Sequence, residues 1–179
     1  MKIVILDRDG VINFDSPDYI KSTQEWIPIP GSIEAIRILS SHGFKIYIAT
    51  NQAGVGRRIF TLNALKKIHG KMIDVIEKRG GRLQGIFYCP HHPDALCECR
   101  KPGIGLLKQI ADHAGNNLEN QPFVGDSLKD IQAARAMGCN PVLVKTGNGL
   151  QTLNSLEQTV DVYDDLLAFA NTLVPQERK

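Results

Sequence analysis

Residues 2–11, with the sequence KIVILDRDGV, decide the fold class of this chain. Residues 2–6 are a short, nearly unbroken apolar run, which is typical of a strand buried on both faces of a parallel sheet. Asp7 and Asp9 follow its carboxyl end two positions apart, so in extended backbone both carboxylates point to one side. Ligands of open α/β sheets bind at this end of the strands. Taken alone, the Asp-x-Asp pattern is more typical of a solvated loop than of a functional site.

The rest of the chain alternates between short apolar runs and helical patterns. This alternation predicts a doubly wound, mostly parallel α/β sheet with no separate cap domain. Further strands are expected at residues 46–49, 85–88, 123–124, 142–144 and 160–163. Ser32 and Thr61 are good N-cap residues for helices that end near Gly43 and Gly80. Later helices are expected at residues 104–115, 128–138 and 164–173.

Length and composition restrict the class of protein. With 179 residues, of which 42% are hydrophobic and 22% charged, one domain over residues 1–179 is expected. A formal net charge of +2 is too small to indicate a nucleic-acid partner. No apolar stretch approaches the roughly 18 residues of a membrane span, and none resembles a signal peptide. We therefore expect a cytoplasmic monomer with neither a nucleic-acid nor a membrane partner.

Polar motifs follow other apolar runs as well. Residues 50–51 (TN) follow the second predicted strand, residues 125–130 (GDSLKD) follow the fourth, and residues 100–102 (RKP) lie between them. Together with residues 7–10 (DRDG), this set resembles the four motifs of the haloacid-dehalogenase (HAD) superfamily of phosphotransferases. The resemblance covers residues 1 to about 145 and agrees in motif type, order and position at strand ends.

The resemblance implies a magnesium-dependent reaction on a phosphate ester. An anionic ester resists an anionic nucleophile unless its charge is neutralised, and Mg²⁺ with a few carboxylate ligands does this. By resemblance, Asp7 and Asp126 hold the metal together with the backbone carbonyl of Asp9, and Asp7 forms an aspartyl-phosphate. Asp9 protonates the leaving oxygen and later takes a proton from water. Thr50 and Lys101 contact the phosphoryl oxygens.

Residues 89–99, with the sequence CPHHPDALCEC, hold three of the four cysteines and two of the five histidines. Such a cluster suits tetrahedral zinc. The alternative is a disulfide, which would leave an odd thiol in a chain without an export signal. The Cys-x-His…Cys-x-Cys pattern favours His91 over His92, as does the resemblance, and gives Cys89, His91, Cys97 and Cys99 as ligands. Four protein ligands leave no open position, so the Zn²⁺ is expected to be structural.

Two loops are candidates for contact with the substrate. The turn-rich residues 13–30 are either a plain connector or a specificity loop. By resemblance this region forms a flap over the site, which would bring Asp15, Ser16, Pro17 and Asp18 to the substrate. Residues 52–58 (QAGVGRR) form the second loop, whose glycines permit close approach but do not match a dinucleotide or Walker fingerprint. The further expected contacts are Asn51, Gln52, Ala53 and Arg100.

The predicted zinc loop at residues 89–99 indicates which HAD subfamily the chain resembles. Residues 7–10 (DRDG), 50–54 (TNQAG) and the cysteine loop that runs into residues 99–102 (CRKP) are similar to the heptose-1,7-bisphosphate 7-phosphatases. This implies removal of the C7 phosphate from a small sugar bisphosphate, in the synthesis of activated heptose for lipopolysaccharide. The alternatives are a histidinol-phosphate or other small-ester phosphatase, which shares the metal loop, and a non-catalytic zinc-binding module. The five residues between His91 and Cys97 are a short version of this loop.

Overall fold

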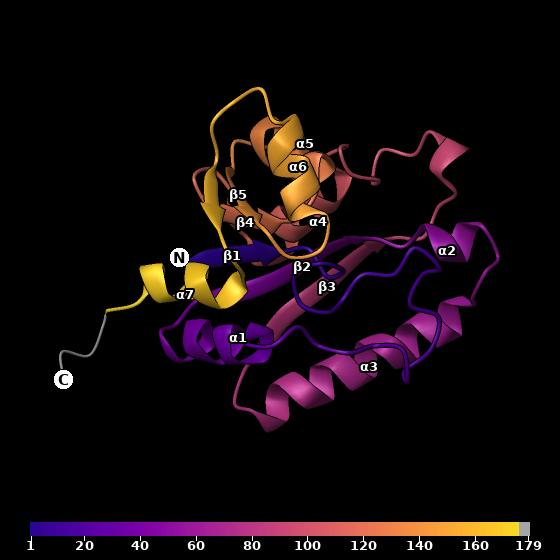
Figure 1. The fold of residues 1–179 in the computed structure, drawn as a ribbon, viewed down its shortest axis with the longest axis horizontal. Coiled ribbons are helices and arrows are strands. Elements are labelled where there is room, and N and C mark those ends of the chain that lie inside the picture. The colour runs from indigo at the N-terminus through magenta and orange to yellow at the C-terminus, as the bar shows by residue number, and fades with distance from the viewer. Residues whose placement is uncertain (176–179) are drawn as a thin grey trace.

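The computed structural model describes residues 1–175, and its centre is a six-stranded sheet (Figure 1). The strand order is β3-β2-β1-β4-β5-β6, and every neighbouring pair is parallel. The strands are β1 (Ile3–Leu6), β2 (Lys45–Asn51), β3 (Leu83–Cys89), β4 (Pro122–Gly125), β5 (Asn140–Val144) and β6 (Asp161–Tyr163). The predicted doubly wound α/β architecture is confirmed, and all the described strand pairs are parallel.

Helices cover both faces of this sheet. Their bounds are α1 (Ser32–Ser41), α2 (Ala53–Gly56), α3 (Leu62–Lys78), α4 (Gly105–Ala114), α5 (Leu128–Ala136), α6 (Gly149–Ser155) and α7 (Leu166–Leu173). A 3-10 turn spans Pro93–Ala95. Helices α1, α3 and α7 lie on one side of the sheet, and α4 and α5 lie on the other (Figure 1). Within residues 1–175, no helix combines the length and the apolar character needed to cross a membrane.

Strand β1 supplies both hydrophobic cores. Val4 and Leu6 pack with apolar residues of α1, α3 and α7, whereas Ile3 and Ile5 pack with those of α4 and α5. All four side chains are fully buried. This alternation follows from the two-residue period of a strand, and it explains why the first apolar run shows no polar face. The end of β1 is therefore fixed from both sides.

Of the two predicted helix N-caps, the one at Thr61 is confirmed and the one at Ser32 is wrong. Thr61 caps α3, because its Oγ1 accepts a hydrogen bond from the Ala64 amide at 3.1 Å. The predicted cap at Ser32 is wrong, because Gly31 precedes the helix with a φ of 85° and Ser32 is the first helical residue. The Ser32 hydroxyl instead donates to the Ile12 carbonyl at 2.7 Å. A contact distant in sequence has therefore replaced the local cap and ties α1 to the segment that follows β1.

The strand order reverses at β1. This strand pairs with β2 on one side and with β4 on the other, so the connections from β1 and β4 diverge. Leu6 is in register with both Ile48 and Val124, so Asp7 and Asp126 follow neighbouring strands at the same edge. Such a switch point is where open α/β sheets bind ligands.

Candidate active site

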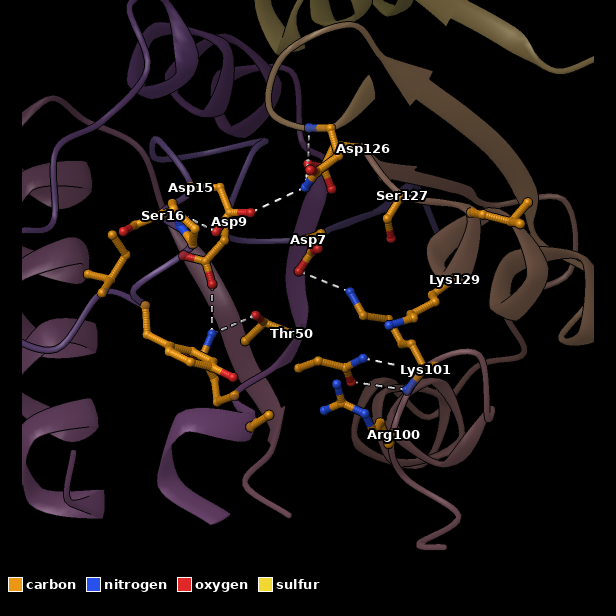
Figure 2. A pocket seen from close by; sticks show the side chains of 18 of the residues that line it. Asp7, Asp9, Asp15, Ser16, Thr50, Arg100, Lys101, Asp126, Ser127 and Lys129 are labelled. Carbon is orange, nitrogen blue, oxygen red and sulfur yellow. Dashed lines mark hydrogen bonds and ion pairs between the residues drawn. The ribbon is translucent and has the colours of Figure 1, made fainter. Parts of the chain in front are cut away.

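A cavity of about 620 Å³ opens at this edge of the sheet (Figure 2). Its walls include five residues predicted to be catalytic or metal-binding, namely Asp7, Asp9, Thr50, Lys101 and Asp126. They come from the ends of β1, β2 and β4 and from the segment before α4. Residues separated by up to about 120 positions in sequence thus face one space, as the strand-end argument predicts.

Lys101 carries a buried positive charge beside Asp7. Its Nζ lies 2.9 Å from Asp7 Oδ1 and 2.5 Å from Asp130 Oδ1, and it donates to the Ala49 carbonyl at 2.7 Å. Burial alone would lower the pKa of Lys101, but the Asp130 and Asp7 carboxylates raise it above its ordinary value. The ammonium group therefore stays charged and can neutralise negative charge that develops beside Asp7.

Three carboxylates meet around this lysine. Asp7, Asp126 and Asp130 each offer an oxygen, and these atoms lie within 4.8 Å of one another. Burial raises the pKa of Asp7 well above its ordinary value, and burial together with the Asp130 charge raises that of Asp126 to about 7. One lysine against three carboxylates leaves two negative charges when all are ionised. The donor set and this charge fit a Mg²⁺ ion.

Asp130 differs from the other two acids because both of its oxygens have protein partners. Oδ1 pairs with Lys101, and Oδ2 accepts hydrogen bonds from the Ser127 amide at 3.1 Å and hydroxyl at 2.6 Å. These contacts form a capping box at the start of α5. Asp130 thus holds Lys101 from the end of a helix.

The Asp126 carboxylate lies in a tight backbone cradle. Its Oδ2 accepts from the Asn148 amide at 2.7 Å and from Asn148 Nδ2 at 3.1 Å. A Cβ atom built on Gly10 or Gly147 would overlap with the same oxygen, and both glycines have positive φ angles. Two glycines and one asparagine therefore fix one oxygen, and Oδ1 is the oxygen that remains for a metal.

Asp9 is held by a different set of donors. Arg8 makes a fork to both of its oxygens at 2.7 and 2.8 Å, Asn13 Nδ2 donates at 2.9 Å, and Gln52 Nε2 donates at 2.9 Å. Burial alone would raise the pKa of Asp9, but the Arg8 charge and these hydrogen bonds hold it below its ordinary value. These contacts therefore favour the ionised form of the Asp9 carboxylate. Gln52 Nε2 also donates a hydrogen bond to Thr50 Oγ1 at 3.0 Å.

Two predicted substrate contacts have distinct environments. The Asn51 amide accepts from the Lys101 backbone N–H at 3.0 Å and donates to the Lys101 carbonyl at 3.1 Å, so it holds the lysine rather than pointing freely into the cavity. Arg100 lines the cavity (Figure 2), and its Nη1 is buried without a hydrogen-bond partner among residues 1–175. An unpaired buried N–H is costly, so this side chain is suited to an anionic ligand.

The two predicted loops contribute fewer residues than expected. Asp15, Ser16 and Pro17 of the flap line the cavity, but Asp18 does not. The Asp18 amide instead donates to the Ser16 hydroxyl at 3.2 Å within a tight turn, which directs this residue to solvent. From the second loop, Gln52 and Ala53 line the cavity, whereas residues 54–58 do not. That loop forms the short helix α2, which carries its later residues away from the opening.

Three cysteines and His91 converge beyond the cavity. Cys89 Sγ lies 3.5 Å from Cys97 Sγ and 3.5 Å from His91 Nδ1, and Cys99 Sγ lies 3.6 Å from Cys97 Sγ and 3.2 Å from His91 Nδ1. Zn–S bonds of about 2.3 Å place two tetrahedral sulfur ligands about 3.7 Å apart. None of the four cysteines, all of which are described, is in a disulfide. The cluster therefore fits zinc, and His92 lies outside it.

Several residues that line the cavity were not among the site residues predicted from the sequence. They are Tyr19, Ile20, Ser127, Leu128, Lys129, Asn148 and Gln151. Asn148 had a signal that could have found it, because it lies in a Thr-Gly-Asn-Gly turn after the predicted strand at residues 142–144. Tyr19 has a positive φ of 65°, which no sequence pattern indicated.

Comparisons with known proteins agree with this geometry. A family model described as HAD-hydrolase-like matches residues 98–169. A D-glycero-beta-D-manno-heptose-1,7-bisphosphate 7-phosphatase of Pseudomonas aeruginosa is 50% identical over 173 residues, which cover 96% of this chain and 97% of the relative. The Pseudomonas putida enzyme of the same name is 49% identical and covers 97% and 100%.

A solved structure is similar over nearly the whole chain. It is the D,D-heptose 1,7-bisphosphate phosphatase of Bordetella bronchiseptica in complex with magnesium and phosphate, with a TM-score of 0.94, 46% identity and coverage of 97% of this chain and 98% of that one. The parallel sheet, the strand-end acids and the extent of these similarities lead to one assignment. The chain belongs to the D-glycero-β-D-manno-heptose-1,7-bisphosphate 7-phosphatases of the HAD-like hydrolases.

Proposed function

We propose that this protein is a magnesium-dependent phosphatase that removes the C7 phosphate of D-glycero-β-D-manno-heptose 1,7-bisphosphate. The observation that carries the proposal is the meeting of Asp7, Asp126 and the buried Lys101 in one strand-end cavity. The family membership supports the sugar substrate over histidinol phosphate. In this role the enzyme would supply heptose 1-phosphate for the synthesis of activated heptose.

The first step is a transfer of the phosphoryl group to the protein. An oxygen of the Asp7 carboxylate attacks phosphorus, and the bond between phosphorus and the C7 oxygen breaks. Asp9 lies two residues further on and delivers a proton to the departing oxygen. Lys101 and Thr50 face the phosphoryl oxygens, where their positive charge and hydroxyl group stabilise charge in the transition state. Asp7, Asp126 and the Asp9 carbonyl would hold a Mg²⁺ ion, which would neutralise further negative charge on the phosphoryl group.

The second step regenerates the free carboxylate. Asp9, now ionised, takes a proton from a water molecule, and the resulting hydroxide attacks the phosphorus of the aspartyl-phosphate. The bond between phosphorus and the Asp7 oxygen breaks, and inorganic phosphate leaves. The hydrogen bonds that hold the pKa of Asp9 below its ordinary value favour the ionised form that this step needs to begin.

We also propose that the cluster of Cys89, His91, Cys97 and Cys99 binds a structural zinc ion. The four ligand atoms lie within 4.8 Å of one another, and four protein ligands leave no position for substrate. The loop continues directly into Arg100 and Lys101, both of which line the cavity. The zinc would therefore fix the backbone from which these two side chains reach the cavity.

A phosphate-release assay tests the function. Heptose 1,7-bisphosphate, histidinol phosphate and small sugar phosphates are compared with Mg²⁺ and with a chelator. We expect Mg²⁺-dependent release that is fastest from the heptose bisphosphate and that is lost in Asp7→Asn, since an amide cannot form the aspartyl ester. Faster release from histidinol phosphate, or undiminished turnover by Asp7→Asn, would contradict the proposal.

A further inference from the structure

Arg8, which holds the Asp9 carboxylate, is buried against His69, a second buried titratable residue to which the reaction described above assigns no role. Their side chains are 1% and 6% exposed, and neither lines the cavity. Arg8 follows the nucleophile Asp7 at the end of β1, whereas His69 lies in the middle of α3, on the face that packs against the sheet. The packing of α3 brings them together across 61 residues of sequence.

The Arg8 guanidinium lies between Asp9 and His69. Its Nε donates to Asp9 Oδ1 at 3.0 Å, and its Nη2 donates to both Asp9 oxygens. On its other side, Nη1 lies 3.2 Å from His69 Nε2. Arginine only donates hydrogen bonds, so Nε2 must accept, and the imidazole is neutral with its proton on Nδ1. Burial and the Arg8 charge agree with this, since they lower the pKa of His69 to about 3.

The other donors to Asp9 are themselves anchored. Asn13 donates to Asp9, and its amide oxygen accepts from the buried Trp26 Nε1 at 3.0 Å. Gln52 joins Asp9 to Thr50. The Arg8 side chain is longer and has more rotatable bonds than the side chains of Asn13 and Gln52. Among the three donors to Asp9, its guanidinium therefore gains most from a second contact that fixes its position. His69 Nε2 provides that contact.

We propose that His69 is a positioning residue for proton transfer, because through Arg8 it holds the Asp9 carboxylate in its orientation toward the leaving oxygen. The inference rests on the proposed role of Asp9. It differs from a plain packing role, in which His69 would fill space against Tyr88, whose ring lies at 5.6 Å with an interplanar angle of 62°. The two roles depend on different properties of the imidazole, namely an acceptor nitrogen and a flat ring.

Two substitutions separate these properties. His69→Phe keeps the ring beside Tyr88 and removes the acceptor, whereas His69→Gln keeps an acceptor and removes the ring. Each variant is assayed with the alkyl ester heptose 1,7-bisphosphate, whose leaving oxygen needs a proton, and with p-nitrophenyl phosphate, whose leaving group departs without one. For both esters, kcat/KM reports the transfer to Asp7.

We expect His69→Phe to lower kcat/KM for the alkyl ester by about tenfold, a part of the 10²–10⁴-fold that general acid catalysis contributes. The value for p-nitrophenyl phosphate should stay within about twofold, and His69→Gln should restore most of the alkyl activity. Equal losses with both esters, no loss, or better function in the Phe variant than in the Gln variant would overturn the inference. If His69→Phe does not fold, Arg8→Lys, which cannot form the fork, must show the same selective loss.

Asp9→Asn separates failure of this inference from failure of the proposed function. If Asp9→Asn loses the alkyl reaction selectively and His69→Phe does not, the role of Asp9 stands and that of His69 falls. If Asp9→Asn shows no selective loss, or if the wild type does not hydrolyse the heptose bisphosphate, both proposals fall.

Discussion

Arg100 shows how one side chain can recognise the part of a substrate remote from the reacting phosphorus. It lines the cavity beside Lys101, and its Nη1 has no hydrogen-bond partner in the described part of the chain. The planar fork of an arginine matches a second anionic or hydroxylated group better than it matches a transferring phosphoryl group. A contact of this kind matters only to substrates long enough to reach it.

Arg100→Ala should therefore lower kcat/KM for heptose 1,7-bisphosphate by about 10- to 100-fold, as expected for a lost charged hydrogen bond. The value for p-nitrophenyl phosphate should change by less than about threefold, because this small ester does not extend to Arg100. Arg57→Ala is a matched control, since Arg57 is exposed and does not line the cavity. A parallel loss with both esters would show that Arg100 acts on the reacting phosphoryl group or on the fold.

The raised pKa of Asp126 predicts that the stability of the metal-free protein depends on pH. Burial, opposed by the Asn148 hydrogen bond and reinforced by Asp130, raises its pKa from 3.8 to about 7. Without metal, the folded state holds this proton to a higher pH than the unfolded chain, so the free energy of unfolding falls as pH rises through this window. The proposed Mg²⁺ site requires the ionised form of Asp126, so added Mg²⁺ should reverse the loss above about pH 7.

Thermal unfolding with a chelator should thus show a larger fall in Tm between about pH 5 and pH 7.5 for wild type than for Asp126→Asn, which has no proton to lose. Mg²⁺ at the higher pH should raise the Tm of wild type and leave that of the variant unchanged. Equal pH slopes, or equal stabilisation by Mg²⁺, would contradict both the burial argument and the metal assignment.

At the scale of elements, the loop from Cys89 to Lys101 joins a metal cluster to the cavity. The Lys101 backbone is held by Asn51 at the end of β2, and the four proposed zinc ligands lie among the preceding residues. The loop has a 3-10 turn of three residues as its only helical structure within the described chain. We therefore expect the loop to depend on the proposed zinc site, as well as on Asn51, for its shape.

Cys97→Ser should abolish tight zinc binding and lower phosphatase activity, because Arg100 and Lys101 lose their fixed backbone. Metal analysis of the wild type should find about one zinc per chain, retained under mild chelation that removes magnesium. Cys139→Ser is the control, since Cys139 is buried outside the cluster. Full zinc content in Cys97→Ser would show that the loop assignment is wrong.

Helices and strands were predicted correctly where neighbouring residues determine them. Predictions failed where contacts between residues distant in sequence determine the local structure. Apolar runs located all six strands, and Thr61 capped its helix as expected. Ser32 does not cap its helix, because its hydroxyl donates to the Ile12 carbonyl, which comes within reach only in the folded chain. His69 was not singled out in the sequence, because its neighbours in α3 give no sign of a contact with the distant Arg8. Positions at strand ends were predictable because parallel strands share an edge.

At the scale of the molecule, the order of the strands could not be read from the chain. Apolar periodicity predicts strands but not which strands are neighbours. In the structure β1 lies inside the sheet, between β2 and β4, with helices on both of its faces. This central position brings the ends of β1 and β4 together. All six strands belong to one sheet, which supports the proposal that the chain folds as a single domain.

The cavity also bears on which phosphate is removed. Figure 2 shows Asp7 between the Asp15 and Ser16 side chains of the flap and the Lys101 and Arg100 side chains, and Asp7 is only 9% exposed. A primary phosphate on the exocyclic C7 carbon can approach a recessed carboxylate end-on, whereas the C1 phosphate is attached directly to the bulky ring. The geometry of the cavity therefore favours reaction at C7.

Phosphorus NMR of the product of heptose 1,7-bisphosphate tests this claim most directly. The C7 phosphate signal should disappear with the appearance of inorganic phosphate, while the anomeric C1 signal remains. Loss of the anomeric signal with survival of the C7 phosphate would contradict the account.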